Sequence, residues 1–129
     1  MDIRIPVSAG EILDKISILE IKSKRIADPA KLGNVRIELA LLTEVRDKAM
    51  PQTFELRGMA EALKAVNEEL WEIEDAIREC ERRGDFGPRF IALARSVYRT
   101  NDRRAALKRR VDAAFGSSIT EEKSYATYE

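Results

Sequence analysis

The most concentrated group of side chains that could do chemistry is SVYRTNDRRAALKRR, residues 96–110, with six basic residues and one acid. Clustered arginine and lysine side chains bind phosphate or carboxylate groups, or they pair with acids of the same chain. If this segment is helical, its basic positions separate onto two faces. On the outer face, Arg99, Arg103 and Arg110 form a stripe with Arg95, which lies just before the segment. Arg104 and Lys108 instead fall on the apolar side.

Polar residues from other segments also fall at inward positions, where they could meet Arg104 and Lys108. A cation that faces an apolar core needs a partner, because an unpaired buried charge is strongly destabilising. Two interpretations are open: an ion-pair network that fixes helix register, or a pocket for a small anion or a nucleotide. The candidate ligand-binding residues are Glu20, Asn67, Glu74, Asn101, Arg104 and Lys108.

The segment EELWE, residues 68–72, has the E-E-x-x-E spacing with which all-α nucleotide pyrophosphohydrolases hold Mg²⁺. A hard cation takes several carboxylate oxygens, and this spacing places them on one helix face. However, Glu68 and Glu72 project away from the apolar stripe of their segment. The E-x-x-D at residues 11–14 also lies upstream rather than downstream, which reverses the order of that family. We therefore expect a solvated acidic face here, with no metal site and no cofactor.

Other catalytic groups are scarce. The chain has no histidine, so the usual general base near neutral pH is missing. Cys80 is the only cysteine and falls on an apolar stripe, which indicates a core residue and a reducing, cytoplasmic setting. Nucleic-acid binding through the outer arginine stripe is a weaker alternative, because Tyr98 is the one aromatic residue near it and the net charge is zero.

The elements that must position these residues are marked by capping and turn signals. Ser8 followed by Glu11 forms a capping box that starts a first helix, and Asp28-Pro29 starts a second. A third helix spans about 53–83, and Pro88 opens a fourth that stops at Gly116. We predict an all-α fold over one domain, residues 1–129: an antiparallel bundle of about four helices with a hairpin of two long C-terminal helices. Residues 1–7 form an extended arm and residues 117–129 an irregular tail.

The apolar pattern also suggests what covers these helices. In the second helix, the inward positions are Leu32, Val35, Leu39, Leu42 and Val45. The first helix has apolar residues on two faces, with Ile18 and Ile21 opposite its main stripe, so we expect one face to be covered by a partner. Together with the arm, this predicts a homodimer whose interface includes Ile3, Ile5, Ile18 and Ile21. No segment is long and apolar enough to span a membrane.

Four segments carry a family resemblance: VSAGEILDKISILEIKSKRI, NEELWEIEDAIRECE, FGPRFIALARSVYRTNDRRAALKRRVD and the closing EEKSY. They resemble DUF6165, a small bacterial family of unknown function, over nearly the whole chain. The resemblance implies no assigned activity or catalytic residues, but it implies a link with surface-polysaccharide and glycosyltransferase genes. We therefore favour a non-enzymatic interaction or assembly module that binds a protein partner. The alternatives are a small-anion or nucleotide-binding protein, including a Mg²⁺-dependent enzyme, and RNA binding through the arginine stripe.

Overall fold

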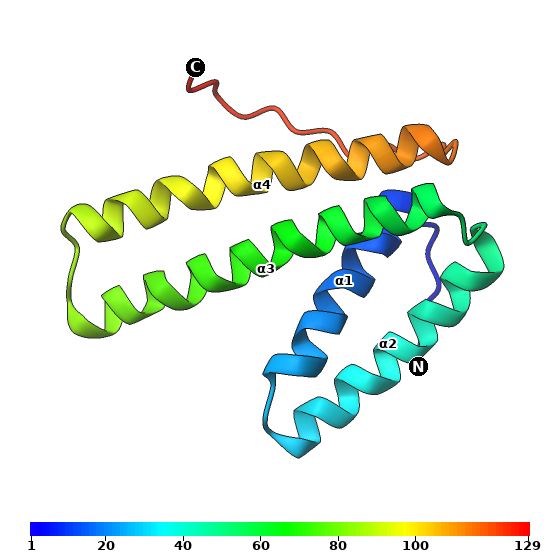
Figure 1. The fold of residues 1–129 in the computed structure, drawn as a ribbon, viewed down its shortest axis with the longest axis horizontal. Helices are drawn as coiled ribbons and strands as arrows, with labels where there is room; N and C mark the ends of the chain where they lie inside the picture. Colours follow the sequence, from blue (N-terminus) through cyan, green and yellow to red (C-terminus); the bar gives the residue numbers. More distant parts are fainter.

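A computed structural model describes residues 1–129 of the chain. It contains four helices and no strands, so the prediction of an all-α fold is confirmed (Figure 1). The helices are α1 (Ala9–Arg25), α2 (Pro29–Ala49), α3 (Phe54–Arg83) and α4 (Pro88–Ala114).

The helix ends follow from local chemistry. The Ser8 hydroxyl accepts a hydrogen bond from the Glu11 backbone N–H at 3.1 Å, and Asp28 caps α2 in the same way. α3 ends at Gly84, whose φ of 69° is the left-handed conformation that glycine adopts without strain. Gly116, with φ of 63°, ends α4 in the same conformation. The caps at Ser8 and Asp28 and the stop at Gly116 were predicted from the sequence and are confirmed.

The helices pack around α1, which contacts each of the other three. α3 and α4 lie antiparallel as two long helices joined by a short turn, and α1 crosses them near the end remote from that turn (Figure 1). The turn end of this pair therefore projects away from α1 and α2. α2 packs on α1 alone.

The hydrophobic core lies where α1 meets the ends of the other helices. Its buried members are Ile12, Leu13, Ile16, Met50, Leu56, Leu63 and Val111. Three of the residues expected on the inward face of α2 do face inward. Val35 is buried, and Leu39 and Leu42 are partly buried against the core. Val45 was wrongly placed: 48% of it is exposed, because α2 has no neighbour on that side.

The two ends of the chain differ in their contacts with the helices. Residues 1–7 are exposed and make no hydrogen bond or ion pair with the rest of the chain. The segment after α4 turns back along that helix (Figure 1), and Tyr128 donates a hydrogen bond to Asp102 at 2.6 Å. None of the four helices combines the length and apolar character needed to cross a membrane.

Candidate functional site

The polar centre of the molecule is the carboxylate of Asp14 on α1, which is 1% exposed. Arg104 on α4 donates to both of its oxygens, from Nε at 2.9 Å and from Nη2. Asn67 on α3 donates from Nδ2 to Asp14 at 2.9 Å and to the Ser17 hydroxyl at 2.7 Å. Ser17 in turn donates to the Asp14 backbone carbonyl at 2.7 Å. One carboxylate thus links three helices.

Electrostatics favours the ionised form of Asp14 despite its burial. Burial raises its pKa, but hydrogen bonds from Arg104 and Asn67, followed by the charges of Arg104 and Lys108, outweigh that effect. The net result is a pKa below the ordinary value. The Asp14 hydrogen bond in turn raises the pKa of Arg104 against the opposing effect of burial. The pair is therefore fully charged at neutral pH.

Lys108 extends the cluster toward the surface. Its ammonium lies 2.7 Å from Glu11 and 2.9 Å from Glu121, and 4.0 Å from Asp14. Burial lowers the pKa of Lys108, but the hydrogen bonds to Glu11 and Glu121 and the nearby carboxylate charges raise it above its ordinary value. Glu121 belongs to the C-terminal tail, and its pKa is lowered, mainly by the hydrogen bond with Lys108. We call this set the Asp14 cluster: Glu11, Asp14, Ser17, Asn67, Arg104, Lys108 and Glu121.

The first turn of α1 is bound to the end of α4 beside this cluster. The Gly10 N–H donates to Asp112 at 2.7 Å, and the Ala9 N–H donates to the Ser117 hydroxyl at 2.9 Å. These groups satisfy helix N-terminal donors that have no partner within α1. Gly10 is required here, because a Cβ would overlap the Lys108 carbonyl oxygen and lie 2.8 Å from Asp112.

The six candidate ligand-binding residues do not form one group. Asn67, Arg104 and Lys108 meet at the Asp14 cluster. Glu20 instead pairs with Lys64 at 3.1 Å, and Glu74 pairs with Arg78 on its own helix at 2.9 Å, so neither belongs to the cluster. The Asn101 side chain is half-buried and makes no hydrogen bond.

The anionic half of the cluster was missed from the sequence. A usable signal existed in the spacing of Gly10, Asp14, Ser17 and Ile21, which recurs every three or four residues and marks one face of α1. This second face of α1 is buried, with Asp14, Ser17 and Ile21 at 1–3% exposure. Its polar members meet α3 and α4 of the same chain.

This finding changes the expected dimer interface. Ile21 is 2% exposed within the single chain, so it is not available to a second subunit and that expectation is corrected. Ile18 is half-buried. Ile3 and Ile5 in the arm remain largely exposed.

Some of the acidic and basic surface residues pair with each other. Within the E-E-x-x-E segment, Glu69 accepts from Arg103 at 2.7 Å and Glu72 pairs with Arg25 at 2.5 Å. No three His, Cys, Asp or Glu side chains lie close enough together to hold a metal ion. On the outer stripe, the neighbouring guanidinium groups of Arg95 and, to a smaller extent, Arg99 lower the pKa of Tyr98.

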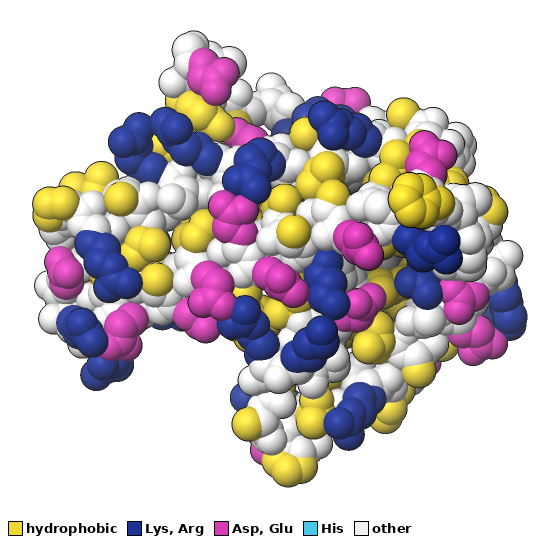
Figure 2. Space-filling view, in the orientation of Figure 1, with side chains coloured by type: hydrophobic (Ala, Val, Ile, Leu, Met, Phe, Trp, Pro, Cys, Tyr) yellow, Lys and Arg dark blue, Asp and Glu magenta, His cyan; other side chains and the backbone are white.

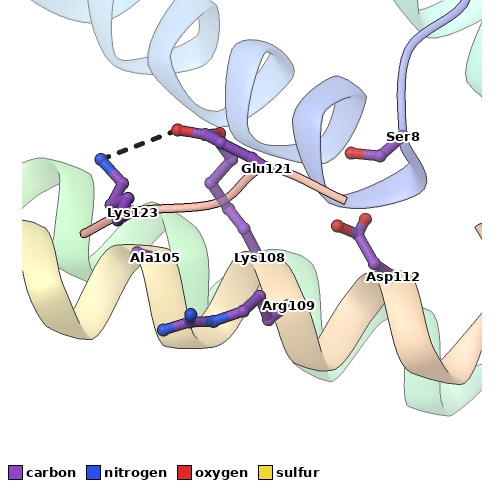
Figure 3. A pocket seen from close by; sticks show the side chains of 7 residues that line it. All are labelled: Ser8, Ala105, Lys108, Arg109, Asp112, Glu121 and Lys123. Atoms are coloured by element: carbon purple, nitrogen blue, oxygen red, sulfur yellow. Dashed lines mark hydrogen bonds and ion pairs between the residues drawn. The ribbon is translucent and has the colours of Figure 1, made fainter. Parts of the chain in front are cut away.

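Space at the cluster limits what it could bind. In Figure 3, Lys108 rises from α4 toward Glu121, which also pairs with Lys123, and Asp112 and Ser8 close the far side. The pocket between these residues has a volume of about 10 Å³, room for about one water molecule. No buried side-chain nitrogen or oxygen lacks a hydrogen-bond partner. The arrangement therefore acts as a closed ion-pair network in this conformation.

Comparison with known proteins identifies a family whose function is unknown. No curated protein and no solved structure matches the chain. Residues 3–128 match the family described as "Family of unknown function (DUF6165)". The match spans almost the entire sequence, so the chain belongs to the DUF6165 family.

Proposed function

We propose that the protein is a non-enzymatic interaction module that self-associates. The observation that carries this proposal is the apolar surface left uncovered at the N-terminal half, on the arm and on α2. Isolated exposed apolar residues are common, but a helix that is apolar on opposite sides is normally covered on both. The exposed apolar residues of the arm and α2 are Met1, Ile3, Ile5, Val7, Ile37, Leu41 and Val45.

The internal polar network supports the same proposal. Arg104 and Lys108 are the inward cations that would hold an anionic ligand. Both already have carboxylate partners: Asp14 for Arg104, and Glu11 and Glu121 for Lys108. A phosphate would have to compete with these carboxylates, and the pocket beside Lys108 has room for about one water molecule. The network instead holds α1, α3 and α4 in a fixed relation, which a binding surface requires.

Sedimentation equilibrium of the full chain tests this proposal. Across rising protein concentration, the apparent mass should move from 14.7 kDa for one chain toward twice that value. The association should persist in high salt, because apolar burial is not screened as ion pairs are. A mass that stays at one chain at every concentration would overturn self-association.

Three further proposals concern the biological setting and RNA. The link with surface-polysaccharide synthesis rests on the family resemblance, and the cytoplasmic setting rests on the lone cysteine. RNA binding would use the outer stripe, in which Arg103 already pairs with Glu69. A steep loss of RNA affinity with salt would support it, and a flat response would overturn it.

A further inference from the structure

We infer that a strip along α4 is a docking surface for an acidic, tyrosine-bearing peptide segment of a partner protein, and that the chain's own tail, residues 117–129, occupies it until the partner displaces it. We call this surface the tail strip: Tyr98, Arg99, Asp102 and Lys108. It lies on α4, which α2 does not contact. The inference therefore goes beyond the proposed self-association and does not depend on it.

One end of the tail strip binds a carboxylate. The Lys108 ammonium donates to Glu121 of the tail at 2.9 Å, and Figure 3 shows the two side chains meeting above α4. The Lys108 side chain is only 13% exposed, and Glu11 holds its ammonium at 2.7 Å from the other side. The cation is thus already in position for a carboxylate that comes from outside the helices.

The other end of the tail strip binds an aromatic ring that carries a hydroxyl group. The Tyr128 hydroxyl donates to Asp102 at 2.6 Å. Its ring centre lies 5.0 Å from that of Tyr98 and 5.5 Å from the Arg99 guanidinium, distances typical of aromatic and cation–π contacts. A carboxylate and a phenol, seated at two separate points, are therefore the groups that this surface recognises.

The tail is held by side chains and not by burial. After Ser117 its backbone makes no hydrogen bond with other backbone groups, and residues 118–129 are all exposed. Segments with so few contacts open at a small cost in free energy. The two anchors can therefore open while the four helices stay folded.

A partner must nevertheless compete with a segment that is tethered beside the strip. Tethering gives the tail an effective concentration on the order of millimolar. A partner segment displaces it only if that segment makes contacts that the tail does not make.

The surface around the strip offers such contacts as unused positive charge. Figure 2 shows Lys and Arg side chains gathered over α4 beside the tail. Within about 100° around α4, four exposed arginines have no carboxylate partner in the chain: Arg95, Arg99, Arg109 and Arg110. Among the tail acids, only Glu121 pairs with α4. A segment with more carboxylates than the tail would therefore bind more tightly than the tail.

Asp102 favours a peptide over a nucleic acid as this partner. It lies in the same sector of α4 as the four arginines and accepts a phenolic hydroxyl. A phosphate backbone that followed these arginines would meet the like charge of Asp102. A peptide brings a hydroxyl donor for Asp102 as well as carboxylates for the arginines.

Fluorescence anisotropy with a labelled peptide of residues 118–129 tests whether the tail covers a docking surface. The full-length double variant Glu121→Gln/Tyr128→Ala loses both tail anchors, while Lys108 keeps its pair with Glu11. The apparent affinity for an added peptide falls with the fraction of molecules whose strip is open, so release of the tail should tighten binding about tenfold. Equal binding to wild type and to the double variant, or binding to neither, would overturn the inference.

The matched control is Glu122→Gln/Tyr125→Ala, which makes the same two chemical changes at tail residues that do not contact α4. Tyr125 is 78% exposed, and its ring contacts only Lys123 of the tail. This variant should bind the peptide as weakly as wild type. Circular dichroism should show that both double variants keep the helical fold. Equally tight binding by the control would contradict the two assigned anchors.

Two further probes test the chemistry of the partner on the Glu121→Gln/Tyr128→Ala protein. A peptide carrying Lys123→Glu should bind more tightly than the unchanged peptide. Its affinity should fall when Arg99→Gln is added, but not when Arg36→Gln is added on α2. An unchanged affinity with Arg99→Gln would overturn the tail strip as the binding surface. An oligouridylate that binds more tightly than the acidic peptide would overturn the peptide partner in favour of RNA.

Discussion

Arg104 donates two hydrogen bonds to the buried carboxylate of Asp14, which lies 90 residues earlier in the chain. This pair joins α4 to α1, and Asn67 brings α3 to the same carboxylate. The site is therefore the polar centre of the fold. A change at either member acts on the packing of three helices rather than on one surface.

We predict that Arg104→Met destabilises the protein by about 3 kcal/mol, because it leaves the buried Asp14 charge without its main partner. Urea denaturation followed by circular dichroism measures the loss. The adjacent Arg103→Met is the control: Arg103 pairs with Glu69 at the surface, where an ion pair contributes about 0–1 kcal/mol. Equal losses in the two variants would contradict a special role for the Asp14 cluster.

Replacement of both partners is expected to be milder than the sum of the single changes. Asp14→Leu/Arg104→Met removes the buried charge as well as its partner, and such pairs are often replaced by apolar residues at little cost. The coupling energy from the four proteins of a double-mutant cycle should therefore be large. Additive effects would show that the two side chains act independently.

We predict an acid-sensitive stability that depends on Asp14. Its pKa is lower in the folded chain than in the unfolded one, so its contribution is fully present above the unfolded pKa, about 4. That contribution is lost as the pH falls through the folded pKa. Asp14→Asn should therefore lose less stability than wild type between about pH 5 and pH 2. Parallel curves for the two proteins, measured as free energy of unfolding against pH, would contradict this assignment.

The helix boundaries could be predicted because their causes are local. Ser8, Pro88 and Gly116 act on backbone groups within a few residues, so the sequence pattern is sufficient to locate them. Placing the site required the relative positions of helices. Helix phase placed Asn67, Arg104 and Lys108 inward in one group, but it did not identify the Asp14 carboxylate at which they meet.

The errors in the site have the same physical origin. Glu74 was placed inward from the register of the hairpin, whereas it pairs with Arg78 on its own helix. Asp14 was considered only as part of the E-x-x-D at residues 11–14, and it was not recognised as the acceptor for Arg104. The second buried face of α1 was assigned to a partner subunit because nothing in the pattern states that α4 covers it. Long-range packing decides each of these cases.

The C-terminal tail should protect Lys108 from chemical modification. Burial lowers the pKa of Lys108, but the hydrogen bond with Glu11 and then the one with Glu121 raise it above the ordinary value. Glu121 also covers the ammonium group. In Glu121→Gln, that carboxylate charge is lost, so we expect faster acetylation of Lys108 by acetic anhydride, read by mass spectrometry. Lys31, which is exposed on α2, provides the internal reference rate. An unchanged ratio of Lys108 to Lys31 labelling would show that the tail does not cover the lysine in solution.

Two glycine substitutions should change stability in opposite directions. A Cβ at Gly10 would overlap the Lys108 carbonyl oxygen, and neither helix backbone can move without disturbing the Gly10–Asp112 hydrogen bond. Gly10→Ala should therefore destabilise the protein by about 1–3 kcal/mol.

Gly33 lies within α2, and a methyl group added there would meet no atom within 4 Å, so Gly33→Ala should stabilise by about 0.5–1 kcal/mol through helix propensity. Thermal unfolding of the two variants beside wild type measures both effects. A neutral Gly10→Ala would mean that α1 and α4 do not approach as closely as the structure places them, and it would count equally against the adjoining Asp14–Arg104 contact.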